Sequence, residues 1–209
     1  MRNITFDNEG KNNLEKEAIE WIRIWCEDTN DKKMPRVALI GDSITENYYR
    51  MVKEALKEVA KVDYLATSYS IASDMYQGCV KSFFQDSVYE VVHFNYGLHA
   101  YSVNEEKYSS CCMEMLQFIS SRAKTIVATT TTVLDETLEA YNLRWKEKVL
   151  VRNEKIKAIA DKLDLNINDL YAVCETFDKT KRYVDGVHFT EEGHKAFAEG
   201  LANYLNKGE

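Results

Sequence analysis

Proline and glycine are scarce in this chain, and long apolar runs are missing. Pro35 is the single proline, and eight glycines are spread over 209 residues, so no flexible linker divides the sequence. No stretch approaches the roughly 20 apolar residues that a membrane-spanning helix needs, and the first residues lack the apolar segment of a secretory signal. We therefore expect one domain over residues 1–209, no membrane partner and, by default, a cytoplasmic location.

Long runs of lysine or arginine are also absent. The formal net charge is −7, with hydrophobic residues at 45% and charged residues at 29%, which is typical of a globular protein. A nucleic-acid-binding protein would need a basic surface to follow the phosphate backbone. The composition therefore argues against a nucleic-acid partner and leaves small molecules as the expected ligands.

The sequence has no recognisable metal or cofactor motif. The five cysteines are odd in number and lack a CxxC pair, so we expect reduced, buried thiols. His188 and His194 are six residues apart, which lacks the i, i+4 spacing of a helical zinc pair. No phosphate loop, dinucleotide fingerprint or cofactor lysine motif is present. We therefore expect neither a metal nor a cofactor.

Short apolar runs alternate with segments of helical periodicity along most of the chain. Strands are expected at residues 36–40, 62–66, 88–95, 124–129 and, more weakly, 165–170; helices are expected at 46–60, 105–122, 138–163 and 190–206. Such alternation predicts a mostly parallel five-stranded sheet covered by helices on both faces. His93, inside the third apolar run, is expected to be a core histidine or to support the site from behind.

The N-terminal region has a different pattern. Residues 1–12 are polar and are expected to be flexible. Residues 13–27 carry apolar side chains at helical spacing, which predicts a helix. That helix could also form a surface for association with a second copy of the chain, so a homo-oligomer is one expected state.

Two polar clusters stand where catalytic groups are expected, because ligands bind at the carboxyl ends of parallel strands. Gly41, Asp42 and Ser43 directly follow the first apolar run, so the serine hydroxyl could face a substrate, although Asp42 and Ser43 could also simply cap the next helix. Asp185 and His188 are three residues apart before the last helix. A carboxylate at that spacing could orient the imidazole, or both groups could be satisfied by the loop backbone.

The combination of these clusters resembles the GDSL/SGNH hydrolase family. That family has a Gly-Asp-Ser block after its first strand and an Asp-x-x-His block before its last helix. The resemblance covers roughly residues 35–206 and implies a flavodoxin-like, three-layer α/β/α sandwich. It also implies Ser43 as nucleophile, with Asp185 and His188 as its base system.

The two middle blocks of the family are altered in this chain. The second block usually supplies a glycine whose N–H points into the oxyanion hole, and Ser73 stands at that position. The third block is Gly-x-Asn-Asp; aligning Gly97 with its glycine places His99 where the asparagine is expected. The resemblance therefore implies an oxyanion hole built from Ser43, Ser73 and either His99 or Asn95.

The function implied by the resemblance is ester hydrolysis through an acyl-serine intermediate. Small carboxylic esters and O-acetylated carbohydrates are the two expected substrate classes. Because the second and third blocks are altered, a weakly active or non-catalytic ligand-binding protein on the same fold is the alternative.

Overall fold

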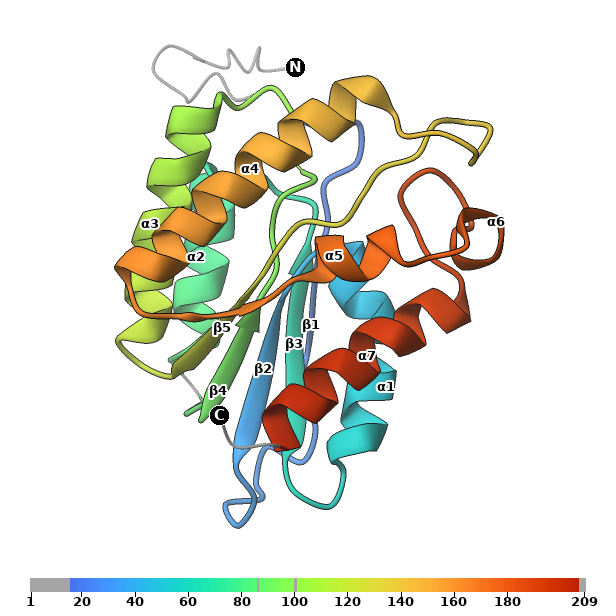
Figure 1. The fold of residues 1–209 in the computed structure, drawn as a ribbon. Coiled ribbons are helices and arrows are strands. Elements are labelled where there is room, and N and C mark those ends of the chain that lie inside the picture. The colour runs from blue at the N-terminus through green and yellow to red at the C-terminus, as the bar shows by residue number, and fades with distance from the viewer. Residues whose placement is uncertain (1–15, 86, 100, 207–209) are drawn as a thin grey trace, which may run out of the picture.

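The computed structural model describes residues 16–85, 87–99 and 101–206, which form a sheet between two layers of helices (Figure 1). The strands are β1 (Ile22–Trp25), β2 (Arg36–Gly41), β3 (Lys61–Thr67), β4 (Val91–Phe94), β5 (Lys124–Ala128) and β6 (Asn166–Asn168). The helices are α1 (Ser43–Leu56), α2 (Asp74–Phe83), α3 (Glu105–Ser120), α4 (Leu143–Lys162), α5 (Leu170–Glu175), α6 (Lys179–Arg182) and α7 (Glu191–Asn206).

The strand order in the sheet is β1-β3-β2-β4-β5-β6. All neighbouring pairs are parallel except β1 with β3, which is antiparallel. Strand β2 lies between β3 and β4. From the carboxyl end of β2, the chain runs through α1 to β3 on one side; from β3 it runs through α2 to β4 on the other side of β2. A crevice forms outside such a switch point, and ligands of open α/β sheets bind there.

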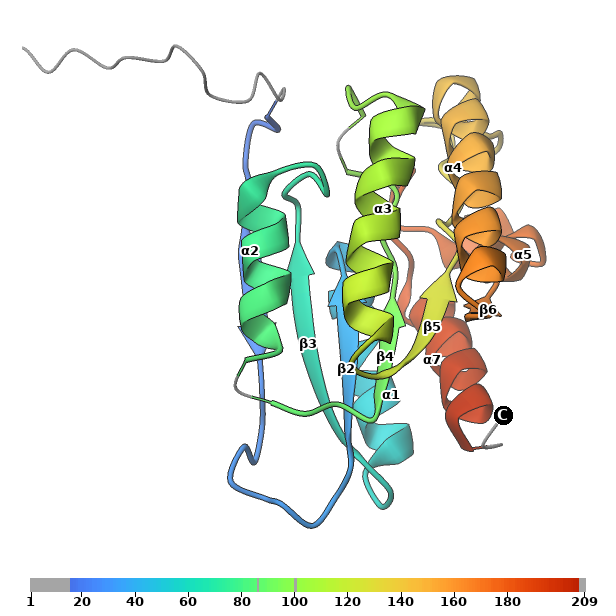
Figure 2. The same ribbon diagram turned by 90° about the vertical axis from the view of Figure 1, so that its left-hand side faces the viewer.

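Two apolar cores fill the space between the layers. Figure 2 shows α2, α3 and α4 in front of the sheet, with α1 and α7 behind it. Alternate residues of each central strand enter opposite cores: Leu39 packs on the α1/α7 side, whereas Ala38 and Ile40 pack on the α2/α3 side. Burial of both faces explains why these strands read as continuous apolar runs.

The predicted three-layer sandwich is confirmed, with one strand more than expected. The five predicted strands correspond to β2 to β6, and four of the five predicted helices correspond to α1, α3, α4 and α7. Helix α2 was not predicted, because its short sequence contains Gly78 and follows a serine-rich segment that is typical of a loop. The short helices α5 and α6 were not predicted either.

The prediction of a helix over residues 13–27 is wrong for the described part, residues 16–27. Residues 22–25 form the edge strand β1, which pairs with β3 in the register Ile22↔Thr67 to Trp25↔Tyr64. The open edge of β3 offers backbone partners, and tertiary pairing overrides helical periodicity in a segment this short. The described residues 16–27 therefore offer no helical surface for self-association, and a homo-oligomer stays a prediction. Residues 1–12 lie outside the described residues.

The cysteines are free thiols, as predicted. Cys111, Cys112 and Cys174 are buried, whereas Cys26 and Cys79 are half-buried. Burial raises the pKa of the Cys112 thiol to about 12, so this side chain behaves as a small apolar group. No helix in the described part of the chain is long and apolar enough to cross a membrane.

Candidate active site

The turn between β2 and α1 presents Ser43 at the carboxyl edge of the sheet. Gly41 is required there, because a Cβ on it would lie 2.0 Å from Thr45 Oγ1. Asp42 is the N-cap of α1, and its carboxylate accepts a hydrogen bond from the Ile44 N–H at 3.0 Å. Since Asp42 caps the helix, the hydroxyl of Ser43 is left available for another partner.

The loop before α7 holds Asp185 and His188 in one fixed arrangement. Tyr183 and Phe189 form an antiparallel bridge that closes the loop. Within it, Asp185 Oδ1 accepts hydrogen bonds from the N–H groups of Val187 at 2.7 Å and His188 at 2.6 Å. The other carboxylate oxygen, Oδ2, lies 2.9 Å from His188 Nδ1. The local sequence therefore sets the orientation of the imidazole.

The two clusters meet across 145 residues of sequence. Ser43 Oγ lies 2.9 Å from His188 Nε2. A carboxylate accepts hydrogen bonds only, so the contact with Asp185 assigns the proton to Nδ1 of His188. Nε2 of the neutral ring then carries a lone pair that can accept the Ser43 proton.

Asp185 is held in its charged form. Partial burial of the carboxyl favours the neutral acid, but the hydrogen bonds from the His188 N–H, the His188 ring and the Val187 N–H outweigh burial and lower the pKa of Asp185. By linkage, these bonds stabilise the fold above the ordinary pKa of an aspartate, and that stability is lost as pH falls through the lowered value. At neutral pH the carboxylate is therefore available to stabilise a protonated His188.

A cavity of about 310 Å³ opens beside Ser43 and His188. Its lining combines the catalytic candidates with apolar and acidic side chains: Glu17, Asp42, Ser43, Leu98, His99, Val133, Trp145, Asp185, Gly186, Val187 and His188. Within the described ranges, no three His, Cys, Asp or Glu side chains are grouped so as to hold a metal ion.

Comparison with known proteins identifies the fold. No family model and no curated protein matches the sequence. Among solved structures, a candidate SGNH hydrolase from Slackia heliotrinireducens superposes with a TM-score of 0.66 at 16% identity, over 83% of this chain and 100% of that one. The chain has the SGNH hydrolase fold.

Two other structures with the SGNH hydrolase fold agree. A GDSL-like lipase from Bacteroides thetaiotaomicron superposes with a TM-score of 0.64 at 18% identity, over 86% of this chain and 91% of that one. The acetylxylan esterase Axe2 from Geobacillus stearothermophilus gives a TM-score of 0.65 at 14% identity, over 82% and 94%. Likeness at these identities establishes the fold, whereas the role of each side chain depends on its own geometry.

The N–H of Ser73, which was predicted to donate into an oxyanion hole, is already hydrogen-bonded within its own turn. Ser73 is the N-cap of α2: its hydroxyl accepts from the Tyr76 N–H, and its own N–H donates to Ser70 O at 2.9 Å. The neighbouring Ala72 N–H donates to Ser70 Oγ at 3.2 Å. Ser73 also does not line the cavity. The prediction for Ser73 is therefore not supported, because capping and a tight turn use the available N–H groups.

The loop after β4 brings His99, but not Asn95, to the cavity. Gly97 is needed in this loop, since a Cβ on it would lie 1.6 Å from Thr130 Oγ1. His99 lines the cavity, and its Nδ1 lies 2.7 Å from Glu17 Oε1. Asn95 is buried, and its N–H donates to a backbone oxygen of β2. Of the two alternatives for the third block, the geometry favours His99.

His93 is a core histidine, one of the two roles expected for it. Its ring is fully buried, with Tyr48 Oη 3.3 Å from Nδ1 and Asn168 Nδ2 3.1 Å from Nε2. Burial lowers the pKa of His93 to about 3, so the ring is neutral at physiological pH. It links α1, β4 and the end of β6 beneath the site.

Glu17 and Trp145 line the cavity, although no sequence motif points to either residue. Glu17 is 82 residues away from His99 and falls in the segment for which a helix was predicted. Trp145 lies in the first turn of α4, where an aromatic residue is indistinguishable from ordinary packing. Only the folded chain shows that both line the same cavity as Ser43.

Proposed function

We propose that this protein is a serine esterase that acts on small carboxylic esters or O-acetylated carbohydrates. The observation that carries the proposal is the continuous chain of contacts from Ser43 Oγ to His188 Nε2 and from His188 Nδ1 to Asp185 Oδ2, each 2.9 Å long. Nucleophile, base and orienting carboxylate at these distances form the arrangement that activates a serine hydroxyl.

The proposed reaction begins with attack of Ser43 Oγ on the ester carbonyl carbon. His188 takes the serine proton at Nε2, and the negative Asp185 stabilises the imidazolium that forms. The tetrahedral intermediate then collapses, His188 returns the proton to the departing alcohol, and an acyl-serine remains. Water, deprotonated by the same His188, attacks the acyl carbon and releases the acid and the free serine.

The oxyanion is proposed to be stabilised by the Ser43 N–H and by His99. The Ser43 N–H belongs to the first turn of α1, where the helix dipole favours negative charge. His99 supplies a second donor from the loop after β4. A single donor of this kind commonly contributes about 3 kcal/mol to transition-state stabilisation.

The dimensions of the cavity favour a small acyl group. Its volume of about 310 Å³ is at the lower end of the range for small-molecule sites. Leu98, Val133, Trp145 and Val187 provide its apolar surface. These side chains suit a short acyl chain such as acetyl better than a long lipid chain.

Covalent labelling tests the proposal. A fluorophosphonate probe should form one adduct per chain, and mass spectrometry of peptides should place it on Ser43. Denatured protein serves as the control, because it lacks the contact between Ser43 and His188. Absence of labelling in folded protein that hydrolyses no aryl acetate would refute the esterase proposal.

A ligand-binding protein without catalysis is the second candidate. The observation that favours it is the hydrogen bond of the Ser73 N–H to Ser70 O, which removes the donor expected from the second block; the neighbouring Ala72 N–H is also engaged by Ser70. Under this alternative, acyl compounds would bind in the cavity while Ser43 stays unmodified. The labelling experiment therefore separates the two candidates.

We predict that Glu17 controls the pH range in which His99 acts. If the Glu17 carboxylate accepts from Nδ1–H, Nε2 can donate to an oxyanion only when the ring is protonated. Burial disfavours the protonated ring, but the hydrogen bond to Glu17 and the charges of Asp42 and Glu17 raise the pKa of His99 above its ordinary value. The other near groups are the Tyr96 ring, 6.3 Å away between centroids, and Arg152, which donates to the His99 carbonyl.

Exchange of Glu17 for Gln should lower the pKa of His99, because burial is then opposed by Asp42 alone. The alkaline limb of kcat/KM should move to lower pH, and nuclear magnetic resonance titration of the His99 ring should move with it. The stability contributed by the pair is present below the unfolded pKa and lost as pH rises through the folded value. An unchanged titration of His99 in Glu17→Gln would contradict this role.

A further inference from the structure

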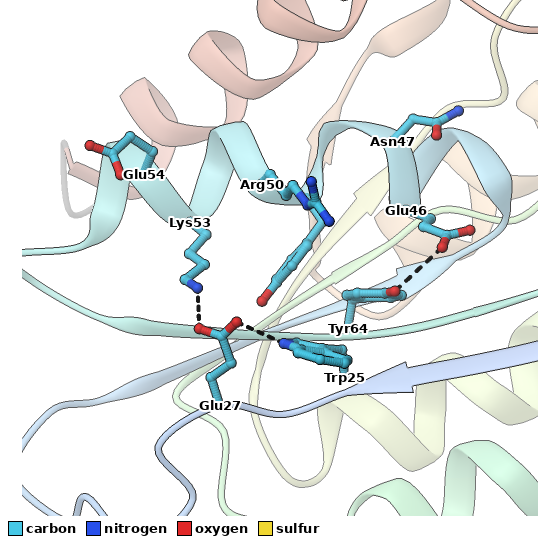
Figure 3. A pocket seen from close by; sticks show the side chains of 9 residues that line it. Trp25, Glu27, Glu46, Asn47, Arg50, Lys53, Glu54 and Tyr64 are labelled. Atoms are coloured by element: carbon cyan, nitrogen blue, oxygen red, sulfur yellow. Dashed lines mark hydrogen bonds and ion pairs between the residues drawn. The ribbon is translucent and has the colours of Figure 1, made fainter.

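A second cavity, of about 710 Å³, lies beside α1 on the outer side of the sheet. The edge strand β1, strand β3 and one side of α1 border it, and Figure 3 shows the side chains that line it. The lining residues are Trp25, Glu27, Glu46, Asn47, Tyr49, Arg50, Lys53, Glu54 and Tyr64. This volume is within the range of sites that bind small molecules.

The carboxylates of this cavity already have basic partners. Glu27 pairs with Lys53 and accepts a hydrogen bond from Trp25 Nε1 at 2.7 Å (Figure 3). Glu46 pairs with Arg23 at 2.7 Å, and Glu54 pairs with a lysine of the next turn. These oxygens can still accept hydrogen bonds, because an ionised carboxylate has about four acceptor positions.

Arg50, by contrast, carries a positive charge that is not paired with any carboxylate of the described residues. Its exposed guanidinium makes no hydrogen bond or ion pair with the residues that the structure describes, and the same is true of the exposed Asn47 amide. Tyr49 lines the cavity with only 5% of its surface exposed, and its hydroxyl is buried without a hydrogen-bond partner in the described part of the chain. An unsatisfied buried hydroxyl is costly, so this group also points to a ligand.

Trp25 adds an aromatic surface to these polar groups. It is opposite Tyr64 in the β1/β3 register, so both rings project toward the α1 side of the sheet. Helix α1 covers Tyr64 but leaves 53% of Trp25 exposed. An exposed indole beside hydrogen-bonding groups is suited to stacking against the C–H face of a sugar ring.

The free polar groups are aligned with the catalytic serine. Ser43, Asn47 and Arg50 are at positions i, i+4 and i+7 of α1 and therefore share one stripe of the helix. Arg50 is about 10 Å from Ser43 along the helix axis, at 1.5 Å per residue. A chain-like substrate held at Ser43 could follow this stripe into the second cavity.

We propose that this cavity binds a saccharide that carries a carboxylate. Trp25 stacks on the sugar ring, Arg50 pairs with the carboxylate as a planar fork, and Asn47 and the acidic side chains bind hydroxyl groups. Hydroxyls donate as well as accept, so they suit a wall of carboxylates that would repel a doubly charged phosphate. The assignment deepens the proposed esterase function, because it defines where the remainder of an acylated acidic saccharide lies.

Binding can be measured without turnover in a Ser43→Ala background. Titration calorimetry would compare a disaccharide of one glucuronate and one xylose, which carries a single carboxylate, with its methyl ester, which has the same sugar rings without the charge. The acid should bind at least about tenfold more tightly, as expected for one charge-assisted pair. Adding Arg50→Gln should remove this preference, and Trp25→Ala should weaken binding of both forms. Arg122→Gln, in the turn after α3, is the matched control for loss of one positive charge.

The kinetic counterpart uses the protein with Ser43 intact. Arg50→Gln should raise KM for an acetylated acidic oligosaccharide about tenfold and leave hydrolysis of a small aryl acetate unchanged. If the esterase proposal is wrong, Ser43 will not be labelled by the fluorophosphonate. The calorimetry does not depend on that result, because it measures binding in a variant that lacks Ser43. Equal binding of acid and methyl ester, no binding of either, or tighter binding of inorganic phosphate would each overturn the saccharide assignment.

Discussion

Ser43→Ala is expected to lower kcat for an aryl acetate by about 10⁴- to 10⁶-fold, the largest effect of any single exchange in this protein. The exchange removes the attacking oxygen, while His188 and Asp185 keep their contact and the cavity keeps its shape. Members of a catalytic serine–histidine–carboxylate set act as a unit, so loss of one removes nearly the whole contribution of the set.

The measurement compares initial rates of purified variants together with their thermal unfolding. Ser43→Ala should unfold at the same temperature as the natural protein, because a half-buried hydroxyl with one side-chain partner contributes little to stability. Ser110→Ala, the same exchange at an exposed position of α3, should retain full activity. Retention of more than about a tenth of the rate by Ser43→Ala would end the assignment of this residue as nucleophile.

Arg152→Ala is expected to reduce the free energy of unfolding by about 3 to 5 kcal/mol. Arg152 is fully buried in α4 and donates to the carbonyl oxygens of Gly97 at 2.6 Å and His99 at 3.1 Å. Arg152 Nε also lies 3.2 Å from the carboxylate of Glu105, the first residue of α3. Removal of the guanidinium leaves the buried carbonyl oxygens without this donor, and it leaves Glu105 with Lys148 as its remaining basic partner at 2.6 Å; loss of one partner from a buried pair is costly.

Thermal unfolding would measure this effect as a decrease in Tm of about 6 to 20 °C, at 2 to 4 °C per kcal/mol for a chain of this size. Arg122→Ala is the control, since an exposed arginine with surface partners should cost less than about 1 kcal/mol. Arg152→Lys keeps the charge without the planar fork and should fall between the two. A Tm of Arg152→Ala within 2 °C of the natural protein would contradict the role of this residue.

The Arg152 network also connects fold stability to the chemistry of the site. The loop that it holds carries His99, the proposed oxyanion donor, so any Arg152→Ala protein that remains folded should lose activity through kcat. Ser43 and His188 belong to other elements, and labelling by a fluorophosphonate should persist, although more slowly. Loss of activity with intact labelling would therefore place the defect in the loop after β4 that carries His99.

Local sequence was enough to predict the parts of the site that are built within a few residues. The Asp-x-x-His spacing sets the loop in which Asp185 holds His188, and Gly41 with Asp42 sets the turn that presents Ser43. The alternation of apolar runs with helical segments likewise predicted β2 to β6, because strands buried on both faces need continuous apolar side chains.

Tertiary structure decided the features that depend on partners distant in sequence. The segment 22–25 has apolar residues compatible with a helix, but the open edge of β3 supplied hydrogen-bond partners and made it a strand. In the sequence, Ser73 stands at the position of the oxyanion-hole glycine. In the structure, its hydroxyl caps α2 and its N–H donates to Ser70 O. The contact of Glu17 with His99 has no local signature.

The sequence by itself determined the mostly parallel sheet and the two local clusters of the proposed site, because these depend on periodicity and on contacts between residues three or four positions apart. Only the folded chain decided that His99 lines the cavity beside Ser43, that Glu17 contacts His99, and where the second cavity lies along α1. Those features arise where separate elements pack together, and packing depends on the three-dimensional positions of all the elements at once.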